Sequence, residues 1–305
     1  MSGRTNRRHF LVHVAAATTV LGSAASRSSL FAMTGPEHRI TVGAHPWVYA
    51  AQQPQYDITP ILDQIFADMK YAGMDAIELM HTALLPDDAV ERIGALSRQH
   101  QLPVLGTSYG ADLWDAAQHD KILADAQMII SRLAKLGGRT LGTSVGATAA
   151  KKTAAQLDAQ AAALRTIMAI CAEHGVTLNL HNHTYEVTDG MYDLRGTLER
   201  IPDAKLGPDL DWLVQAGVDP VQFIVEFGDR IVFLHLRDQM SDKKWVESLG
   251  EGQMNYDAIR IALEKVHFSG DAVIELAHPS DLKLSRPLRE SLKMSRQFVR
   301  DKLGY

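Results

Sequence analysis

Eight short apolar segments, each followed by a segment with helical periodicity, constrain the fold of this chain more than any other feature. Strands that are connected through helices lie parallel in one sheet. Eight such units in about 270 residues match a closed (β/α)8 TIM barrel better than an open, doubly wound sheet, which would also alternate. We therefore expect an α/β fold with a single barrel domain.

The expected strands are short and rich in apolar residues, and they lie at 40–44, 75–79, 102–106, 139–143, 176–181, 206–209, 230–236 and 271–276. The expected helices cover 58–72, 86–100, 116–136, 154–174, 192–200, 256–266 and 284–302, and one more opens at 219–220. Thr153 suits an N-cap, Gly73 and Gly175 suit helix ends, and Pro86 suits a first turn.

Four consecutive strands end in residues that can bind a metal ion: His181, Asp209, His235 and Glu275. The carboxyl ends of barrel strands all face one mouth, so residues far apart in sequence converge there. A single histidine at a strand end is more often a hydrogen-bonded structural residue, but four such ends favour a metal site. Two imidazoles and two carboxylates suit Mn²⁺, Zn²⁺, Co²⁺ or Fe²⁺ better than Ca²⁺. We expect a metal-dependent enzyme.

The first 33 residues differ in kind from the rest. Arg7-Arg8 is followed by Phe10-Leu11 and by a moderately apolar stretch, 12–25, that is too short to span a bilayer stably. This pattern is typical of a twin-arginine export signal. We expect a signal peptide over 1–33, a barrel over 34–305, recognition by the twin-arginine export machinery and a periplasmic location. Cleavage after Ala25 or after Ala32 would fit, and a mobile basic N-terminus is the alternative.

Charge and cysteine content narrow the function further. Without the four arginines of the leader, the chain has 27 basic and 36 acidic residues, a formal net charge of −9, which disfavours nucleic acid. No Gly-x-Gly-x-x-Gly motif follows an expected strand, and no phosphate loop of the Lys-Ser/Thr type occurs. The single cysteine, Cys171, excludes an intramolecular disulfide. No segment after the leader predicts a membrane span. The sequence does not decide the oligomeric state, and a homo-oligomer is compatible with it.

Three motifs surround these strand ends: His181-Asn-His183-x-x-Glu186, Asp209-x-x-Trp212-x-x-x-x-Gly217-Val-Asp219-Pro220 and Leu234-His235-Leu-Arg237-Asp238. Together they resemble the sugar phosphate isomerase/epimerase family of xylose isomerase-like TIM barrels. That group also contains inosose isomerases and dehydratases, ketose 3-epimerases and endonuclease IV. The resemblance extends over about 39–302.

The resemblance implies one divalent metal ion, commonly manganese, held by His181, Asp209, His235 and Glu275. In the family the metal holds two neighbouring oxygens of a keto sugar, and carboxylates on either side move a proton next to the carbonyl. Such a metal acts as a Lewis acid that stabilises an enediolate.

The chain departs from the ketose epimerases, which have a glutamate where His181 stands and a histidine where Trp212 stands. A metal-bound imidazole is a poor base, so Glu186 or His183 is expected to take that task. The remaining candidate for the base is Glu275, because a base must lie within hydrogen-bond reach of the reacting carbon.

Further strand-end residues are candidate substrate contacts: Arg237, His45, Trp47, Glu78, Tyr109 and Trp212. Trp47 could stack on a sugar face or pack under the first loop. Arg237 could bind hydroxyls or a carboxylate, or form a salt bridge. Asp238 could orient His235 or a cationic side chain from behind. Trp245 and the Gly250-Glu251-Gly252 segment predict flexible loops near the mouth.

Our leading hypothesis is an exported metal-dependent isomerase or epimerase acting on a free sugar, keto sugar or inositol-like polyol. A lyase or dehydratase acting on a 3-keto glycoside would use the same first proton transfer. A non-catalytic sugar-binding protein on the same barrel is the alternative from another class. An endonuclease would need a basic face, against which the net charge argues.

Overall fold

The structure is a computed structural model that describes residues 40–278 and 282–305. The chain divides into two units, Met1–Glu37 and His38–Tyr305, and all the described residues belong to the second. The expected signal peptide falls outside them, so export stays a prediction. None of the helices in the described part combines the length and the apolar run that a bilayer-spanning helix requires.

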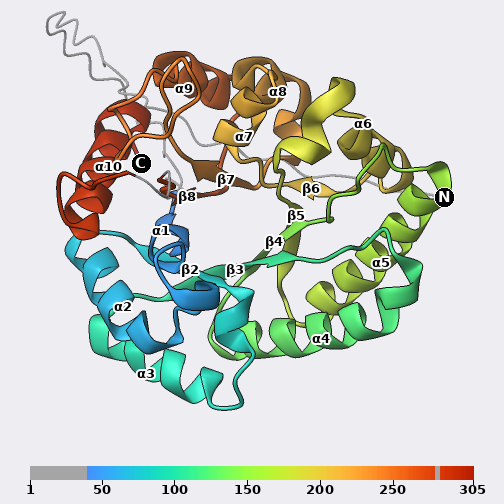
Figure 1. Ribbon diagram of the computed structural model, residues 1–305, viewed down its shortest axis with the longest axis horizontal. Helices are drawn as coiled ribbons and strands as arrows, with labels where there is room; N and C mark the ends of the chain where they lie inside the picture. The colour runs from blue at the N-terminus through green and yellow to red at the C-terminus, as the bar shows by residue number, and fades with distance from the viewer. Residues whose placement is uncertain (1–39, 279–281) are drawn as a thin grey trace, which may run out of the picture. The chain divides into compact units, whose positions relative to one another are not determined.

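Eight parallel strands form the centre of the second unit (Figure 1). They are β1 (Val42–Ala44), β2 (Ala76–Met80), β3 (Val104–Gly110), β4 (Thr140–Ser144), β5 (Thr177–Leu180), β6 (Lys205–Leu206), β7 (Phe233–Leu236) and β8 (Asp271–Ile274). Their order in the sheet is β6-β5-β4-β3-β2-β1-β8-β7. Two isolated parallel bridges, Leu206 to Ile231 and Asp209 to His235, join β6 to β7 and close the ring. The expected TIM barrel is confirmed.

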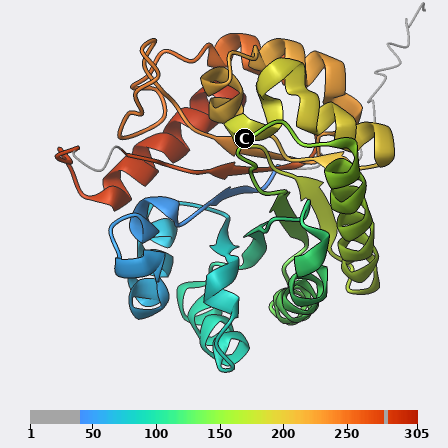
Figure 2. The same cartoon turned by 45° about the vertical axis from the view of Figure 1, so that its right-hand side comes forward.

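Helices surround this ring, as Figures 1 and 2 show. The α-helices are α1 (Trp47–Ala50), α2 (Leu62–Tyr71), α3 (Ala89–His100), α4 (His119–Lys135), α5 (Ala154–Glu173), α6 (Thr184–Arg200), α7 (Leu210–Gln215), α8 (Pro220–Phe227), α9 (Tyr256–Lys265) and α10 (Leu288–Leu303). Short 3-10 turns are η1 (Pro54–Tyr56), η2 (Thr59–Ile61), η3 (His81–Leu84), η4 (Ala116–Gln118) and η5 (Gly228–Arg230).

Several expected helix ends are confirmed by their caps. The Thr153 side chain accepts a hydrogen bond from the backbone N–H of Gln156, and the Gln156 side chain accepts one from the backbone N–H of Thr153. This reciprocal pair is a capping box at the start of α5. Asp219 caps α8 ahead of Pro220. Gly73 and Gly175 have φ of 79° and 68°, left-handed values that favour glycine after a helix.

Other boundaries were predicted wrongly. Helix α3 begins at Ala89 and not at Pro86, and α10 begins at Leu288. Helix α6 begins at Thr184, well before the expected 192, but its backbone leaves helical geometry at 188–191. Asp189, Gly190 and Met191 all have positive φ there, which explains why no continuous helical periodicity runs through the segment.

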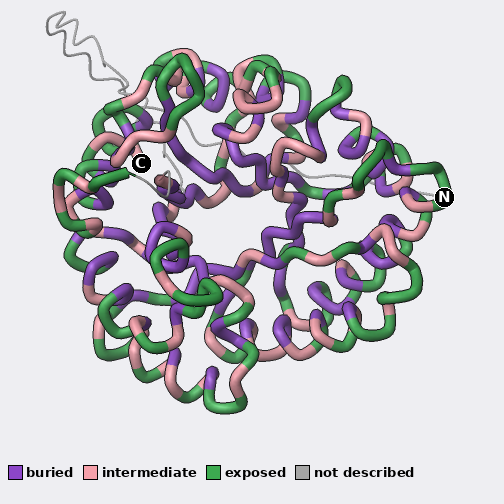
Figure 3. Tube along the Cα trace, in the orientation of Figure 1, coloured by how far each residue is buried: buried purple, intermediate pink, exposed green. Residues whose placement is uncertain are grey.

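The alternation of side chains along the strands builds a layered barrel interior. Ala76, Leu105, Phe233 and Val273 form a small apolar cluster in which all four are buried. Successive residues of a strand point to opposite faces, so the residues two positions further on share the inward face. Figure 3 shows the buried trace gathered on the strands and the exposed trace on the outer side of the helices. The layer above the apolar cluster is polar, and it forms the floor of the candidate site.

Candidate active site at the barrel mouth

The polar layer follows directly from strand geometry. Glu78 stands two residues after Ala76, His235 two after Phe233 and Glu275 two after Val273. All three are buried. Each of these three strands therefore places an apolar residue deep in the barrel and an ionisable residue above it, toward the mouth.

His235 lies at the centre of this layer. Its Nε2 lies 2.5 Å from Oε2 of Glu78, and its Nδ1 lies 2.9 Å from Oε2 of Glu275. The same Nδ1 is 3.1 Å from Nδ1 of His181. Burial alone would lower the pKa of His235, but the charges of Glu78 and Glu275 outweigh it and raise the pKa to about 10. With no other cation bound, His235 is therefore held as an imidazolium.

The donor set fits a metal ion. One ligand atom from each of His181, Asp209 and His235 can be chosen so that all lie within 4.8 Å of one another. In this cluster three buried carboxylates, Glu78, Asp209 and Glu275, face a single buried guanidinium, that of Arg237. The cluster therefore lacks positive charge unless a histidine takes up a proton or a cation binds. Imidazole and carboxylate ligands suit manganese, zinc, cobalt or iron.

Arg237 bridges two of these carboxylates. Its Nε lies 2.9 Å from Oδ2 of Asp209, and its Nη2 lies 2.7 Å from Oε1 of Glu275. Its guanidinium also lies over the rings of Trp212 and Trp245, at 5.3 and 6.0 Å from their centroids. The buried Nη1 has no hydrogen-bond partner among the described residues, so this donor is available to a ligand.

Glu275 is ionised while its neighbour His45 is neutral. Burial would raise the pKa of Glu275, but the positive charges of Arg237 and His235 hold it well below its usual value. Burial lowers the pKa of His45. Its Nδ1 accepts from the backbone N–H of Trp47 at 3.2 Å, so that nitrogen carries a lone pair and the 3.4 Å approach to Glu275 is no ion pair. A carboxylate without its proton at this place can serve as a base.

A cavity of about 480 Å³ opens above the cluster. Its wall includes His183, Arg237 and Glu275 together with five tyrosine and tryptophan side chains: Trp47, Tyr56, Tyr109, Trp212 and Trp245. Trp212 and Trp245 meet edge to face at 5.6 Å between ring centroids. Aromatic walls around a few convergent polar groups are typical of a site for a small organic ligand.

The chain matches the family described as xylose isomerase-like TIM barrel over residues 66–298. It belongs to this family. Solved structures with the same fold include D-allulose 3-epimerase from Methylomonas sp., at 18% identity and a TM-score of 0.71, covering 87% of this chain and 98% of that one. L-ribulose 3-epimerase is 21% identical with a TM-score of 0.70, covering 87% and 95%. The 3-keto-D-glucoside 4-epimerase from E. coli is 17% identical with a TM-score of 0.65, covering 85% and 100%. No curated protein sequence matches significantly.

Most residues that the sequence nominated do converge in this xylose isomerase-like barrel. His181, His183, His235, Arg237 and Glu275 line the cavity, as do His45, Trp47, Tyr109, Trp212 and Trp245. Asp209 is fully buried directly behind Arg237, and its Oδ1 accepts from the backbone N–H groups of Asp211 and Trp212.

Glu186 is placed away from this lining. Its Oε2 accepts from the backbone N–H of His183 at 2.8 Å, and its Oε1 accepts from that of Val145 at 3.3 Å. Burial raises the pKa of Glu186 to about 8, although these backbone donors oppose the shift. The carboxyl group therefore caps the start of α6, and His183 is the better-placed candidate for proton transfer. Burial lowers the pKa of His183 to about 4, which keeps it neutral.

Asp238 also takes a place different from the expected one. Its carboxylate accepts backbone N–H bonds from Gly250, Gly252 and Met254 at 2.9 to 3.2 Å. A Cβ on Gly252 would lie 2.1 Å from Oδ1 of Asp238, so only glycine allows this approach. The segment expected to be a flexible loop is thus tied to the end of β7.

Some lining residues were not nominated from the sequence: Tyr56, His81, Ser108, Ser144 and His278. His81 directly follows β2 and Ser144 ends β4, so the rule that strand ends face the mouth could have found both. Tyr56 lies in a loop without periodicity, and no pattern in the sequence points to it.

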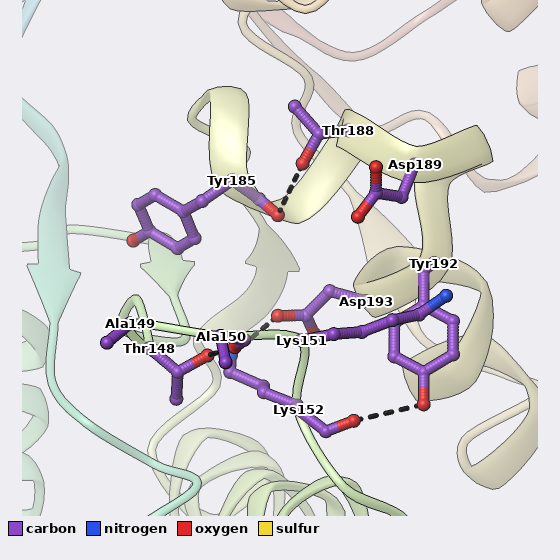
Figure 4. A pocket seen from close by; sticks show the side chains of 10 residues that line it. All are labelled: Thr148, Ala149, Ala150, Lys151, Lys152, Tyr185, Thr188, Asp189, Tyr192 and Asp193. Carbon is purple, nitrogen blue, oxygen red and sulfur yellow. Dashed lines mark hydrogen bonds and ion pairs between the residues drawn. The ribbon is translucent and has the colours of Figure 1, made fainter.

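A second, smaller pocket lies at the rim of the mouth, between the loop after β4 and the start of α6 (Figure 4). Lys152 is buried there, and its Nζ lies 2.6 Å from Oδ2 of Asp193 and 2.7 Å from Oε1 of Gln160. Tyr192 donates to the backbone carbonyl of Lys152 at 3.0 Å. These polar groups bond to one another, so the rim pocket is a structural contact between the loop after β4 and α6.

Glu78 was expected to contact substrate, but it is fully buried beneath the cavity and meets Nε2 of His235. A carboxylate on the far nitrogen of a metal-binding histidine fixes the ring and raises its basicity. We expect Glu78→Gln to weaken the binding of a divalent metal ion by about 10- to 100-fold, measured by titrating manganese into the metal-free protein. Glu91→Gln, on the outer face of α3, is the matched control and should bind the metal as wild type does. Equal affinity in both variants would contradict this positioning role.

Proposed function

We propose that this chain is a divalent-metal-dependent isomerase or epimerase that moves a proton next to the carbonyl of a keto sugar or keto polyol. One observation carries the proposal: His181, Asp209 and His235 converge on the floor of the aromatic cavity, with the ionised Glu275 beside them. The three fold neighbours, all named as epimerases of sugars or sugar derivatives, agree with it.

His181, Asp209 and His235 would hold the metal, and Glu275 would complete the set. Manganese is the first expectation, with zinc, cobalt and iron as alternatives. When bound, the ion supplies Lewis acidity that stabilises negative charge developing on the substrate oxygens. It would also take the place of the proton on His235, since metal ligands must be deprotonated.

The protein's own groups divide the remaining tasks. Glu275 takes the proton from the carbon next to the carbonyl, because it is ionised and lies on the cavity wall. His183 is neutral, and its Nδ1 has no hydrogen-bond partner among the described side chains, so it can exchange a proton elsewhere on the substrate. The N–H donor at Nη1 of Arg237 orients a substrate oxygen.

The lining favours a substrate without phosphate. Arg237 is the one lysine or arginine among the described residues that line the cavity, and its charge is already shared by Asp209 and Glu275. A phosphate would need further donors. The lyase alternative gains no support, because all three reported neighbours are named epimerases.

The test is solvent proton exchange. The full chain, loaded with manganese, is incubated in D₂O with a panel of keto sugars and followed by NMR. Deuterium at the carbon next to the carbonyl, together with an epimer or an isomer, is the expected result. A sugar that binds without any exchange would overturn the proposal in favour of the non-catalytic sugar-binding protein.

A further inference from the structure

Two aromatic rings form a platform at the outer edge of the cavity. Trp47, the first residue of α1, and Tyr56, the last of η1, stack with their centroids 5.4 Å apart and their planes 17° from parallel. Both line the cavity. We call this pair the aromatic platform. Tyr56 nevertheless remains 54% exposed, so aromatic surface outside the stacked contact is left for a ligand.

The backbone that carries Tyr56 is strained. Gln55 and Tyr56 have φ of 56° and 58°, two successive non-glycine residues in the left-handed region. Each such residue costs on the order of 1 kcal/mol or more, and such strain gathers at ligand clamps. Tyr56 recovers little of this through burial, because more than half of it faces solvent. Packing alone therefore does not explain its position.

The platform lies nearer to solvent than the reacting groups, because Tyr56 is 54% exposed and Glu275 is 6% exposed. The backbone N–H of Trp47 donates to Nδ1 of His45, and that nitrogen lies 3.4 Å from Oε1 of Glu275. A sugar ring placed against Glu275 therefore leaves the platform for another part of the ligand. A cavity of about 480 Å³ also falls in the range of roughly 300–1,000 Å³ that holds ligands larger than one sugar ring.

We propose that the substrate is a keto sugar joined to a second ring, a glycoside or disaccharide, and that the second ring stacks on the aromatic platform of Trp47 and Tyr56. This inference rests on the proposed function for the identity of the first ring. Ring stacking on an aromatic face is favourable because it buries apolar C–H surface against a flat π-system. The platform thus selects substrates by the group attached to the keto sugar.

Binding of two matched ligands tests the platform. The probes are the methyl and phenyl glycosides of one 3-keto hexose, which differ only in the second ring, titrated calorimetrically into the manganese-loaded full chain. We expect wild type to bind the phenyl glycoside about ten-fold more tightly, a factor of the size that one aromatic contact provides. Tyr56→Ala should remove most of that preference, whereas Tyr56→Phe should keep it. Tyr71→Ala is the matched control, since Tyr71 is 49% exposed on α2.

The outcomes separate this inference from the proposed function. Equal affinity of wild type for both glycosides, or a preference that survives in Tyr56→Ala, would overturn the platform. A phenyl preference lost in Tyr56→Ala supports it even where no deuterium exchange occurs, because binding is measured without turnover. Exchange on a free keto sugar with no phenyl preference would support the proposed function and refute the second-ring subsite.

Discussion

Glu275→Gln is expected to lower kcat by about 10²- to 10⁴-fold, the range that loss of a general base produces. Glutamine keeps the size of the side chain and one oxygen for Nη2 of Arg237, now 2.7 Å from Oε1, but it can neither carry charge nor accept the substrate proton. The measurement is the rate of epimerisation and of deuterium uptake at saturating manganese, with the bound metal counted by elemental analysis. A fall in kcat together with an equal fall in deuterium uptake, with metal still bound, supports Glu275 as the base.

Glu186→Gln distinguishes this from the alternative that the sequence left open. Glu186 accepts backbone N–H groups from His183 and Val145 and lies outside the cavity lining. Its replacement should therefore change stability more than kcat. A fall in kcat for Glu186→Gln as large as that for Glu275→Gln would assign the proton transfer to Glu186 and contradict our proposal.

The barrel could be predicted because its determinants are local. Each determinant is visible in the sequence of a single segment: a buried strand of four or five residues, a helix cap such as Thr153, or a glycine after a helix such as Gly175. Strand β6 shows the limit: Gly207-Pro208 ends it after two residues, and Asp209 pairs with His235 only through an isolated bridge. Proline cannot donate to a ladder, so the predicted longer strand could not form.

The site could be predicted as a set of residues but not as a set of contacts. The rule that strand ends face one mouth brought His181, His235 and Glu275 together. It could not show that Glu78 lies below the cavity, because its partner His235 is 157 positions away. Nor could it show that the Asp238 carboxylate binds Gly250 and Gly252, since such backbone donors carry no sequence pattern.

Lys152→Met is expected to lower the free energy of unfolding by about 3–5 kcal/mol, the cost of leaving one member of a buried ion pair alone. Lys152 is 4% exposed and Asp193 is 6% exposed. Asp193 would keep its bonds to Oδ1 from Gln160, at 2.8 Å, and from Thr197, at 3.5 Å, and lose the ammonium 2.6 Å from Oδ2. Urea denaturation of the full chain measures the loss. The control is Lys302→Met, which breaks an exposed pair with Asp257 and should cost about 0.2–1 kcal/mol.

The double variant Lys152→Met with Asp193→Leu decides what the pair contributes. Replacing both charges removes the unpaired carboxylate, so most of the lost stability should return if the penalty comes from desolvation. The side-chain amide of Gln160 then still donates to the Thr197 hydroxyl at 2.7 Å, so part of the hydrogen-bond network remains. If the double variant were as unstable as the single one, the pair itself would hold the loop after β4 against α6. Tyr185 lines the same rim pocket and stacks on His183, with 5.4 Å between the ring centroids. Loss of the ion pair would then also disturb His183 in the cavity wall.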